Sequence, residues 1–136
     1  MAVALDSNVV VGFLDRSDKL HEAADGDVRG LLQSGEQLTV SVITYAELMT
    51  GARLGHHDEK QVEGFLHELV SRILPVDVAV ADRAASLRAQ TRSVAMPDAL
   101  IVATAELAPE VTALVSGDPA LAGIEGLGCA VVLVGP

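Results

Sequence analysis

Four acidic side chains recur in one kind of setting, next to apolar runs. They are Asp6, Glu47, Asp98 and Asp118. Asp6 directly follows the apolar residues 2–5, and Asp98 directly precedes the apolar residues 99–102. Each acid has a structural explanation, because a carboxylate in the first turn of a helix is stabilised by about 0.3–1 kcal/mol and Asp is a common N-cap. That explanation is favoured for any one acid alone, whereas the recurrence indicates a site.

Carboxylates that converge on one place repel each other, and some take up protons unless a cation is present. Mg²⁺ and Mn²⁺ prefer carboxylate and water oxygens. The sequence has 19 Asp and Glu against nine Lys and Arg, a formal net charge of -10. Proteins that bind nucleic acid through its phosphates are usually basic, so if nucleic acid is the ligand here, bound cations would have to supply the missing positive charge. We therefore hypothesise a metal-dependent phosphodiesterase in which the metal activates a water molecule.

Short apolar strands alternate with helices along the chain. We predict strands over residues 2–5, 38–42, 74–76, 112–115 and 130–134, and helices over residues 7–16, 21–34, 45–54, 58–73, 79–90 and 97–107. Strands that are apolar throughout and alternate with helices indicate a parallel sheet covered on both faces. The prediction is an α/β fold of three layers, α/β/α, with a central, mostly parallel five-stranded sheet in a single domain over residues 1–136. Sites in such sheets lie outside the carboxyl ends of the strands, where the four acids are expected.

The composition excludes several classes of protein. No apolar run approaches the roughly 18 residues that a membrane-spanning helix needs. No basic segment precedes an apolar one at the N-terminus, so we expect no signal peptide. The single cysteine, Cys129, allows no disulfide within the chain and reads as a small hydrophobic side chain. We expect a soluble, cytoplasmic protein.

Four segments of the chain resemble the motif blocks of a known family. They are ALDSN at the N-terminus, SVITYAELMTGA after the second predicted strand, MPDALIVATA near residue 100 and ALVSGDPAL after the fourth. In order and spacing they resemble PIN-domain ribonucleases, most closely the VapC-type toxins of toxin–antitoxin pairs. The resemblance spans essentially the whole chain. Any single block is weak evidence, but the four together are specific.

The resemblance implies roles for particular residues. Asp6, Glu47, Asp98 and Asp118 would hold Mg²⁺ or Mn²⁺, with Ser7, Asn8 and Ser116 in supporting positions. It also implies RNA cleavage by metal-activated water, inhibition by a cognate antitoxin, and a homodimer. One departure concerns Leu121, where many relatives have an aromatic residue three positions after the last acid, so Asp118 is the least secure ligand.

Other polar residues have simpler explanations. The run Gly55-His56-His57-Asp58-Glu59 looks like a metal cluster, but adjacent loop residues point in different directions, so we expect a solvated loop. Gly51 is expected to permit close packing. Arg16, Arg53, Arg88 and Arg92 could each meet a phosphate, and the sequence does not distinguish among them.

Two alternatives stay open at this point. One is an aspartate-based phosphatase or a phosphoacceptor domain, which normally needs a lysine late in the chain, whereas Lys19 and Lys60 both come early. The other is a PIN-like protein that has lost catalysis and only binds a partner. The intact set of four acids argues against that second alternative.

Overall fold

The computed structural model describes residues 1–135. Its central sheet has the strand order β3-β2-β1-β4-β5, and every neighbouring pair of strands is parallel. The strands are β1 (Ala2–Leu5), β2 (Gln37–Ser41), β3 (Val70–Leu74), β4 (Val111–Ser116) and β5 (Ala130–Leu133). The predicted α/β fold with a five-stranded sheet is therefore confirmed, and the sheet is parallel throughout. This topology brings the carboxyl ends of all five strands to one edge.

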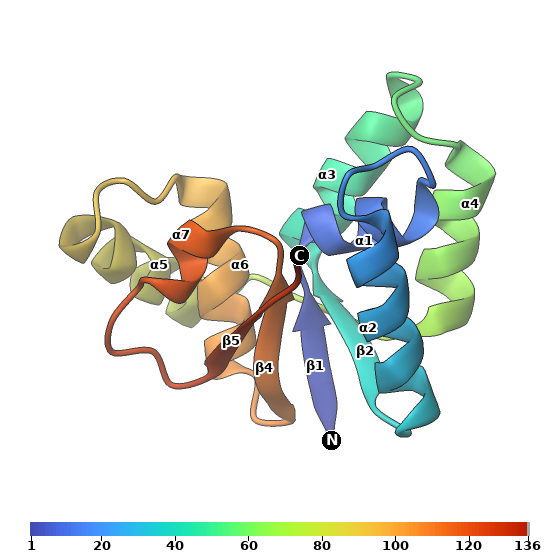
Figure 1. The fold of residues 1–136 in the computed structure, drawn as a ribbon. Coiled ribbons are helices and arrows are strands. Elements are labelled where there is room, and N and C mark those ends of the chain that lie inside the picture. The colour runs from blue at the N-terminus through green and yellow to red at the C-terminus, as the bar shows by residue number, and fades with distance from the viewer. Residues whose placement is uncertain (136) are drawn as a thin grey trace.

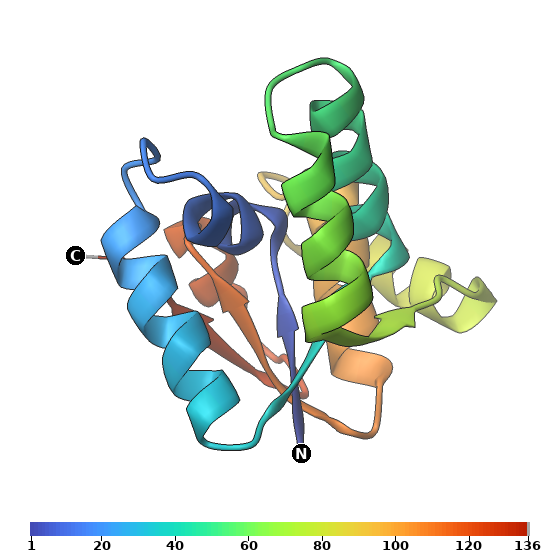
Figure 2. The ribbon, with the colours of Figure 1, turned by 90° about the vertical axis from the view of Figure 1, so that its right-hand side faces the viewer.

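Helices cover both faces of the sheet (Figure 1). They are α1 (Ser7–Leu14), α2 (His21–Gln33), α3 (Val42–Arg53), α4 (Glu59–Gly64), α5 (Val78–Gln90), α6 (Met96–Leu107) and the short α7 (Pro119–Ala122). Helices α5, α6 and α7 lie on one side of the sheet and α1, α2 and α4 on the other, while the pair α3 and α4 extends beyond the carboxyl ends of the strands (Figure 2). No helix within residues 1–135 has the length and apolar character needed to cross a membrane.

The central strand β1 shows why the layers form. All four of its residues are buried, and successive side chains of a strand point to opposite faces. Ala2 and Ala4 therefore pack with the apolar residues of α5 and α6, whereas Val3 and Leu5 pack with those of α1, α2 and α3. Two hydrophobic cores, one on each face, hold β1 in the middle of the sheet and fix Asp6 at its end.

Residues 58–74 differ from the prediction. The predicted helix over residues 58–73 ends early: α4 continues into a π-helical turn, η1 (Phe65–Leu69), and β3 begins at Val70 rather than at residue 74. Strand β3 pairs on one side only, with β2, and most of it is exposed. An exposed edge strand lacks the continuous apolar run that identifies a buried strand, so its sequence could not be distinguished from the end of an amphipathic helix.

Candidate active site

Asp6 lies at the end of β1 and is 4% exposed. It occupies the N-cap position of α1, where one carboxylate oxygen accepts a hydrogen bond from the Ser7 amide at 2.8 Å. The other oxygen accepts from the Ser116 hydroxyl at 2.7 Å and from the Asn8 side-chain amide at 3.5 Å. The carboxylate is thus held on both oxygens by groups from α1 and β4.

Ser116 and Asn8 also tie the end of β4 to this acid. The Ser116 side chain is fully buried, and its hydroxyl oxygen accepts a hydrogen bond from the Asp118 amide at 3.0 Å. The Asn8 side-chain oxygen accepts from the Gly117 amide at 2.9 Å. The residues following β1 and β4 therefore form one network, in which the two supporting side chains each bridge Asp6 to the backbone before Pro119.

Glu47 joins the network through Ser7, whose hydroxyl donates to the Glu47 carboxylate at 2.6 Å. Glu47 lies in the second turn of α3, because that helix begins at Val42, earlier than the predicted residue 45, with Ser41 as its N-cap. The Ser41 hydroxyl accepts from the Ile43 amide at 3.0 Å, which explains why a residue predicted to lie in a strand starts a helix. Glu47 itself is exposed.

Asp98 and Asp118 complete the acidic set. Asp98 is half-buried in the first turn of α6, which Met96 and Pro97 open. Asp118 is the N-cap of α7 and accepts a hydrogen bond from the Ala120 amide at 3.0 Å. Leu121, the departure from the family's pattern, is 1% exposed and belongs to the core, so it does not face the acids as a free side chain.

The electrostatics show that the four acids interact with one another. Burial raises the pKa of Asp6 above its ordinary value, and repulsion by Glu47 and Asp118 raises it further, against the lowering effect of the Ser116 and Ser7 hydrogen bonds. Burial likewise raises the pKa of Asp98, and Asp6 and Asp118 add repulsion. Each of the four predicted acids therefore repels, or is repelled by, at least one of the others. We call this set, Asp6, Glu47, Asp98 and Asp118, the acidic site.

The chemistry of the acidic site fits a hard divalent cation. Its ligands would be carboxylates, and a cation beside Asp6 and Asp98 would offset the burial and the repulsion that raise their pKa values. The geometry is less complete, because no group of three or more His, Cys, Asp or Glu side chains within residues 1–135 stands close enough together to hold an ion. The four acids are close enough to affect one another's ionisation, but no three of them lie close enough together to coordinate one ion.

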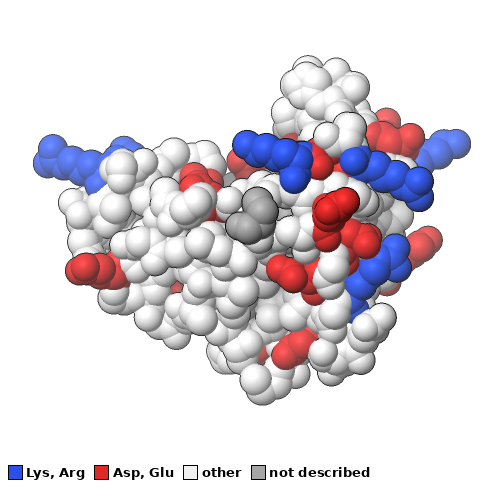
Figure 3. Space-filling model, in the orientation of Figure 1, with Lys and Arg blue, Asp and Glu red and all other residues white. Residues whose placement is uncertain are grey.

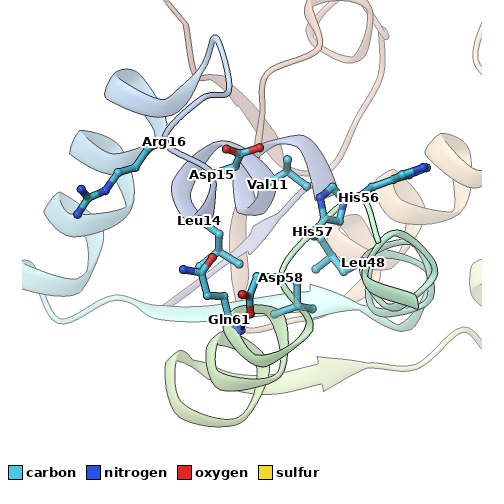
Figure 4. Close-up of a pocket in the computed structure, with 10 residues that line it drawn as sticks. Val11, Leu14, Asp15, Arg16, Leu48, His56, His57, Asp58 and Gln61 are labelled. Carbon is cyan, nitrogen blue, oxygen red and sulfur yellow. Dashed lines mark hydrogen bonds between the residues drawn. The ribbon is translucent and has the colours of Figure 1, made fainter. Parts of the chain in front are cut away.

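A second group of polar residues lies apart from the acidic site. A cavity of about 360 Å³ lies between the end of α1, the end of α3 and α4, and Asp15, His57 and Gln61 are among its lining residues (Figure 4). The solvated loop predicted for residues 55–59 is correct for the exposed His56 and wrong for His57, which is half-buried. A Cβ on Gly51 would lie 2.4 Å from the His57 ring, so the glycine makes room for that ring.

The comparison with known protein families decides the identity. The sequence profile described as "PIN domain" matches residues 3–126. The chain belongs to the PIN domain family. No curated protein sequence is significantly similar to it.

Solved structures show the same fold as this PIN domain. A toxin–antitoxin complex from Klebsiella pneumoniae contains a chain with 28% identity and a TM-score of 0.68, over 96% of this chain and 95% of that one. VapBC2 from Rickettsia felis, bound to a DNA fragment from its promoter, contains a chain with 17% identity and a TM-score of 0.75, over 99% and 100%. VapC20 of Mycobacterium tuberculosis, a toxin that cleaves the sarcin–ricin loop, has 16% identity and a TM-score of 0.66, over 90% and 95%.

Sequence reasoning had missed one part of this PIN domain's site. Gly117, which precedes Asp118, packs against Leu20 from the connection between α1 and α2, and a Cβ at position 117 would lie 2.6 Å from the Leu20 Cδ1 atom. The two residues are far apart in sequence, and a Gly-Asp-Pro turn gives no indication of which distant side chain packs on its glycine. Only the fold brings residues 19 and 20 beside the acidic site.

Proposed function

We propose that this protein is a Mg²⁺- or Mn²⁺-dependent endoribonuclease, built as a single domain, and the toxin of a toxin–antitoxin pair that acts in the cytoplasm. The observation that carries the proposal is the buried Asp6 carboxylate, which Glu47 and Asp118 repel while Ser116 and Asn8 hold it in place. Carboxylates that are buried and repelled by neighbouring acids occur more often at functional sites than elsewhere in proteins. Membership of the PIN family and the ribonuclease activity stated for a structurally similar toxin support the same reaction.

One group of residues would bind the cation, and a second group orients two of those ligands. Asp6, Asp98, Glu47 and Asp118 would hold the cation, whose preferred ligands are carboxylate and water oxygens. When bound, Mg²⁺ or Mn²⁺ supplies a more acidic water and positive charge for the phosphate. Ser116 and Asn8 fix Asp6, and Ser7 fixes Glu47, so these two carboxylates are oriented before any ligand arrives.

The antitoxin and the homodimer are proposed by analogy. Chains of similar fold occur in VapBC complexes and in a toxin–antitoxin complex. An antitoxin segment carrying arginine would complement the acidic site, because a guanidinium forms strong paired hydrogen bonds with carboxylates. Light scattering of the purified protein, alone and with a candidate antitoxin co-expressed with it, tests both assemblies.

The decisive experiment measures RNA cleavage with the cation and the acids removed in turn. EDTA is expected to abolish cleavage, and added Mn²⁺ or Mg²⁺ to restore it. Asp6→Asn and Asp98→Asn are expected to abolish cleavage even with the cation present, whereas Asp82→Asn, a change at a surface acid of α5, leaves it intact. Cleavage that survives both EDTA and Asp6→Asn would refute the mechanism.

A PIN domain that binds a partner without catalysis is the second candidate. The observation that favours it is that, within residues 1–135, no three Asp, Glu, His or Cys side chains lie close enough together to bind an ion. Isothermal calorimetry separates the two candidates. The nuclease takes up Mn²⁺ in a manner that depends on Asp98, and the binding protein takes up none.

A further inference from the structure

A cavity of about 520 Å³ adjoins the acidic site on the side of Asp118. It lies between the connection of α1 and α2, the turn after β4 and the end of β5, and it is lined by Lys19, Leu20, Gly117, Pro119, Leu133, Val134 and Gly135. Its walls are mostly apolar, and Lys19 is the charged side chain among them. A volume of several hundred cubic ångströms with apolar walls and few polar groups is typical of a small-molecule or nucleotide site.

The walls of this cavity are held in place by the fold. The Leu20 amide donates to the Asp18 carboxylate at 2.8 Å, and this hydrogen bond fixes the loop that carries Lys19. Leu20 also packs against Gly12 and Gly117, where an added Cβ would lie 3.2 and 2.6 Å from its side chain. On the opposite wall the Val134 amide donates to the Ser116 carbonyl at 2.8 Å. The cavity is therefore preformed.

The cavity and the acidic site share the turn at residues 116–119. Gly117 and Pro119 line the cavity, and Asp118 lies between them in sequence. The Gly117 amide donates to Asn8, which in turn donates to Asp6. The cavity therefore adjoins the acids through this shared turn.

Positive charge is scarce on this molecule, so a basic side chain beside the acidic site is a candidate for binding phosphate. The chain has two lysines, Lys19 and Lys60, and a net charge of -10. On the face shown in Figure 3, acidic and basic groups are scattered around a broad uncharged area, and no basic patch is present there. Lys19, exposed beside the acidic site, is suited to a phosphate that the acids alone would repel.

We propose that this cavity is a nucleotide subsite of the ribonuclease: its apolar walls hold one base of single-stranded RNA next to the cleaved bond, and Lys19 binds a flanking phosphate. The proposal rests on the proposed function. Apolar walls receive the face of a base without a full set of hydrogen bonds, so Leu133 and Leu20 would set a preference of size and shape at that position.

Two pairs of variants test the subsite, each with a matched control. Lys19→Gln is compared with Lys60→Gln, which changes the other exposed lysine, on α4. Leu133→Ser is compared with Val132→Ser, its neighbour on β5, because the two side chains are 45% and 47% exposed and Val132 lies outside the cavity wall. Binding of a fluorescein-labelled single-stranded RNA of mixed sequence is measured in Ca²⁺ by anisotropy, and cleavage in Mn²⁺ by sequencing the products.

Lys19→Gln is expected to lower the slope of log affinity against log salt by about 0.7, the value for one single-strand phosphate, and to raise KM with little change in kcat. Leu133→Ser is expected to raise KM about tenfold and to relax the base preference beside the cleaved bond. Both controls should retain the wild-type slope, KM and preference.

The outcomes separate this proposal from the nuclease itself. RNA cleavage in which both cavity variants behave like their controls would overturn the subsite and leave the nuclease standing. RNA binding that depends on Lys19 without any cleavage would support the subsite and refute the nuclease. A wild-type protein that binds no RNA would overturn the subsite.

Discussion

Two carboxylates of the acidic site, Asp6 and Asp118, are also helix caps. Asp6 accepts the Ser7 amide with one oxygen and the Ser116 hydroxyl with the other, and Asp118 accepts the Ala120 amide with one oxygen. A helix cap needs only one acceptor oxygen. The structural and the functional explanations of these residues are therefore compatible, and the cap contributes to the site by fixing the direction of the carboxylate.

Asp98 is the acid whose replacement should separate stability from function. Its pKa is raised by burial and by Asp6 and Asp118, so the ionised side chain destabilises the metal-free fold at neutral pH. Asp98→Asn is expected to stabilise the metal-free protein by about 0.5–1 kcal/mol, a few degrees in Tm, after allowance for screening by solvent. Calorimetry with EDTA checks the gain. The same variant should lose the rise in Tm that Mn²⁺ gives the wild type, and unchanged behaviour in both would contradict the role of Asp98.

Ser116 is expected to act as a positioning residue. Ser116→Ala removes a donor from Asp6 and leaves the Asp118 amide without its acceptor, which should cost about 1–3 kcal/mol of stability. Loss of a group that orients a metal ligand should also lower Mn²⁺ affinity or kcat about 10- to 100-fold. Ser71→Ala is the control, because the Ser71 hydroxyl donates to the Leu38 carbonyl away from the site. Equal Mn²⁺ affinity and kcat in the two variants would show that Ser116 does not position Asp6 for metal binding.

At the scale of elements, the connection between α3 and α4 depends on a close contact between the His57 ring and the helix α3. Gly51 lies inside α3, and the His57 ring packs where its side chain would be. Nearby, Asp15 at the end of α1 has a pKa below its ordinary value, first because Ser17 donates to it through its side chain and backbone and then because His57 and His21 lie near. The His57 ring thus lies between Gly51 of α3 and Asp15 at the end of α1.

Gly51→Ala is therefore expected to destabilise the fold by about 1–2 kcal/mol, because the His57 ring has to move. In a His57→Ala background the sign should reverse, with Gly51→Ala stabilising by up to about 1 kcal/mol through helix propensity. Urea denaturation of the two single variants and the double variant measures this coupling.

Gly64→Ala in α4, which would meet nothing within 4 Å, should stabilise the protein equally in both backgrounds. Additive effects of Gly51→Ala and His57→Ala would show that the ring and the glycine do not interact.

At the scale of the whole molecule, Asp6 and Asp98 on one hand and Glu106 on the other respond oppositely to pH. The raised pKa values of Asp6 and Asp98 mean that their stabilising protonated forms are lost as the pH rises through those values. Glu106, which pairs with Arg83 at 2.5 Å and accepts from the Gly128 amide, has a lowered pKa. Its contribution is present above its ordinary pKa and is lost as the pH falls through the lowered one.

The metal-free protein is therefore expected to reach its highest Tm at mildly acidic pH, below neutrality and above the range in which Glu106 takes up its proton. Added Mg²⁺ should move that maximum towards neutral pH, since cation binding favours the ionised acids. Scanning calorimetry across the pH range, with EDTA or Mg²⁺, measures the shift. The same maximum under both conditions would mean that the acidic site takes up no Mg²⁺.

The sequence by itself determined the elements whose patterns are local and strong. Buried strands such as β1 and β4 are recognised in the sequence by their apolar runs. An acid directly after such a run lies at the carboxyl edge of a parallel sheet, whatever the order of the strands. For that reason the α/β fold and the positions of Asp6 and Asp118 after β1 and β4 could be predicted, whereas Glu47 and Asp98 lie on the helices α3 and α6. The strand β3 could not, because an exposed edge strand carries no such pattern.

Only the tertiary structure decided which distant residues touch. The hydrogen bonds from Ser116 to Asp6 and from the Gly117 amide to Asn8 each join residues about a hundred positions apart, and they exist because β4 pairs beside β1. The cavity beside Lys19 likewise depends on packing between the α1–α2 connection and the ends of β4 and β5. Such contacts are set by the volumes and hydrogen bonds of the assembled layers, which no local pattern of residues encodes.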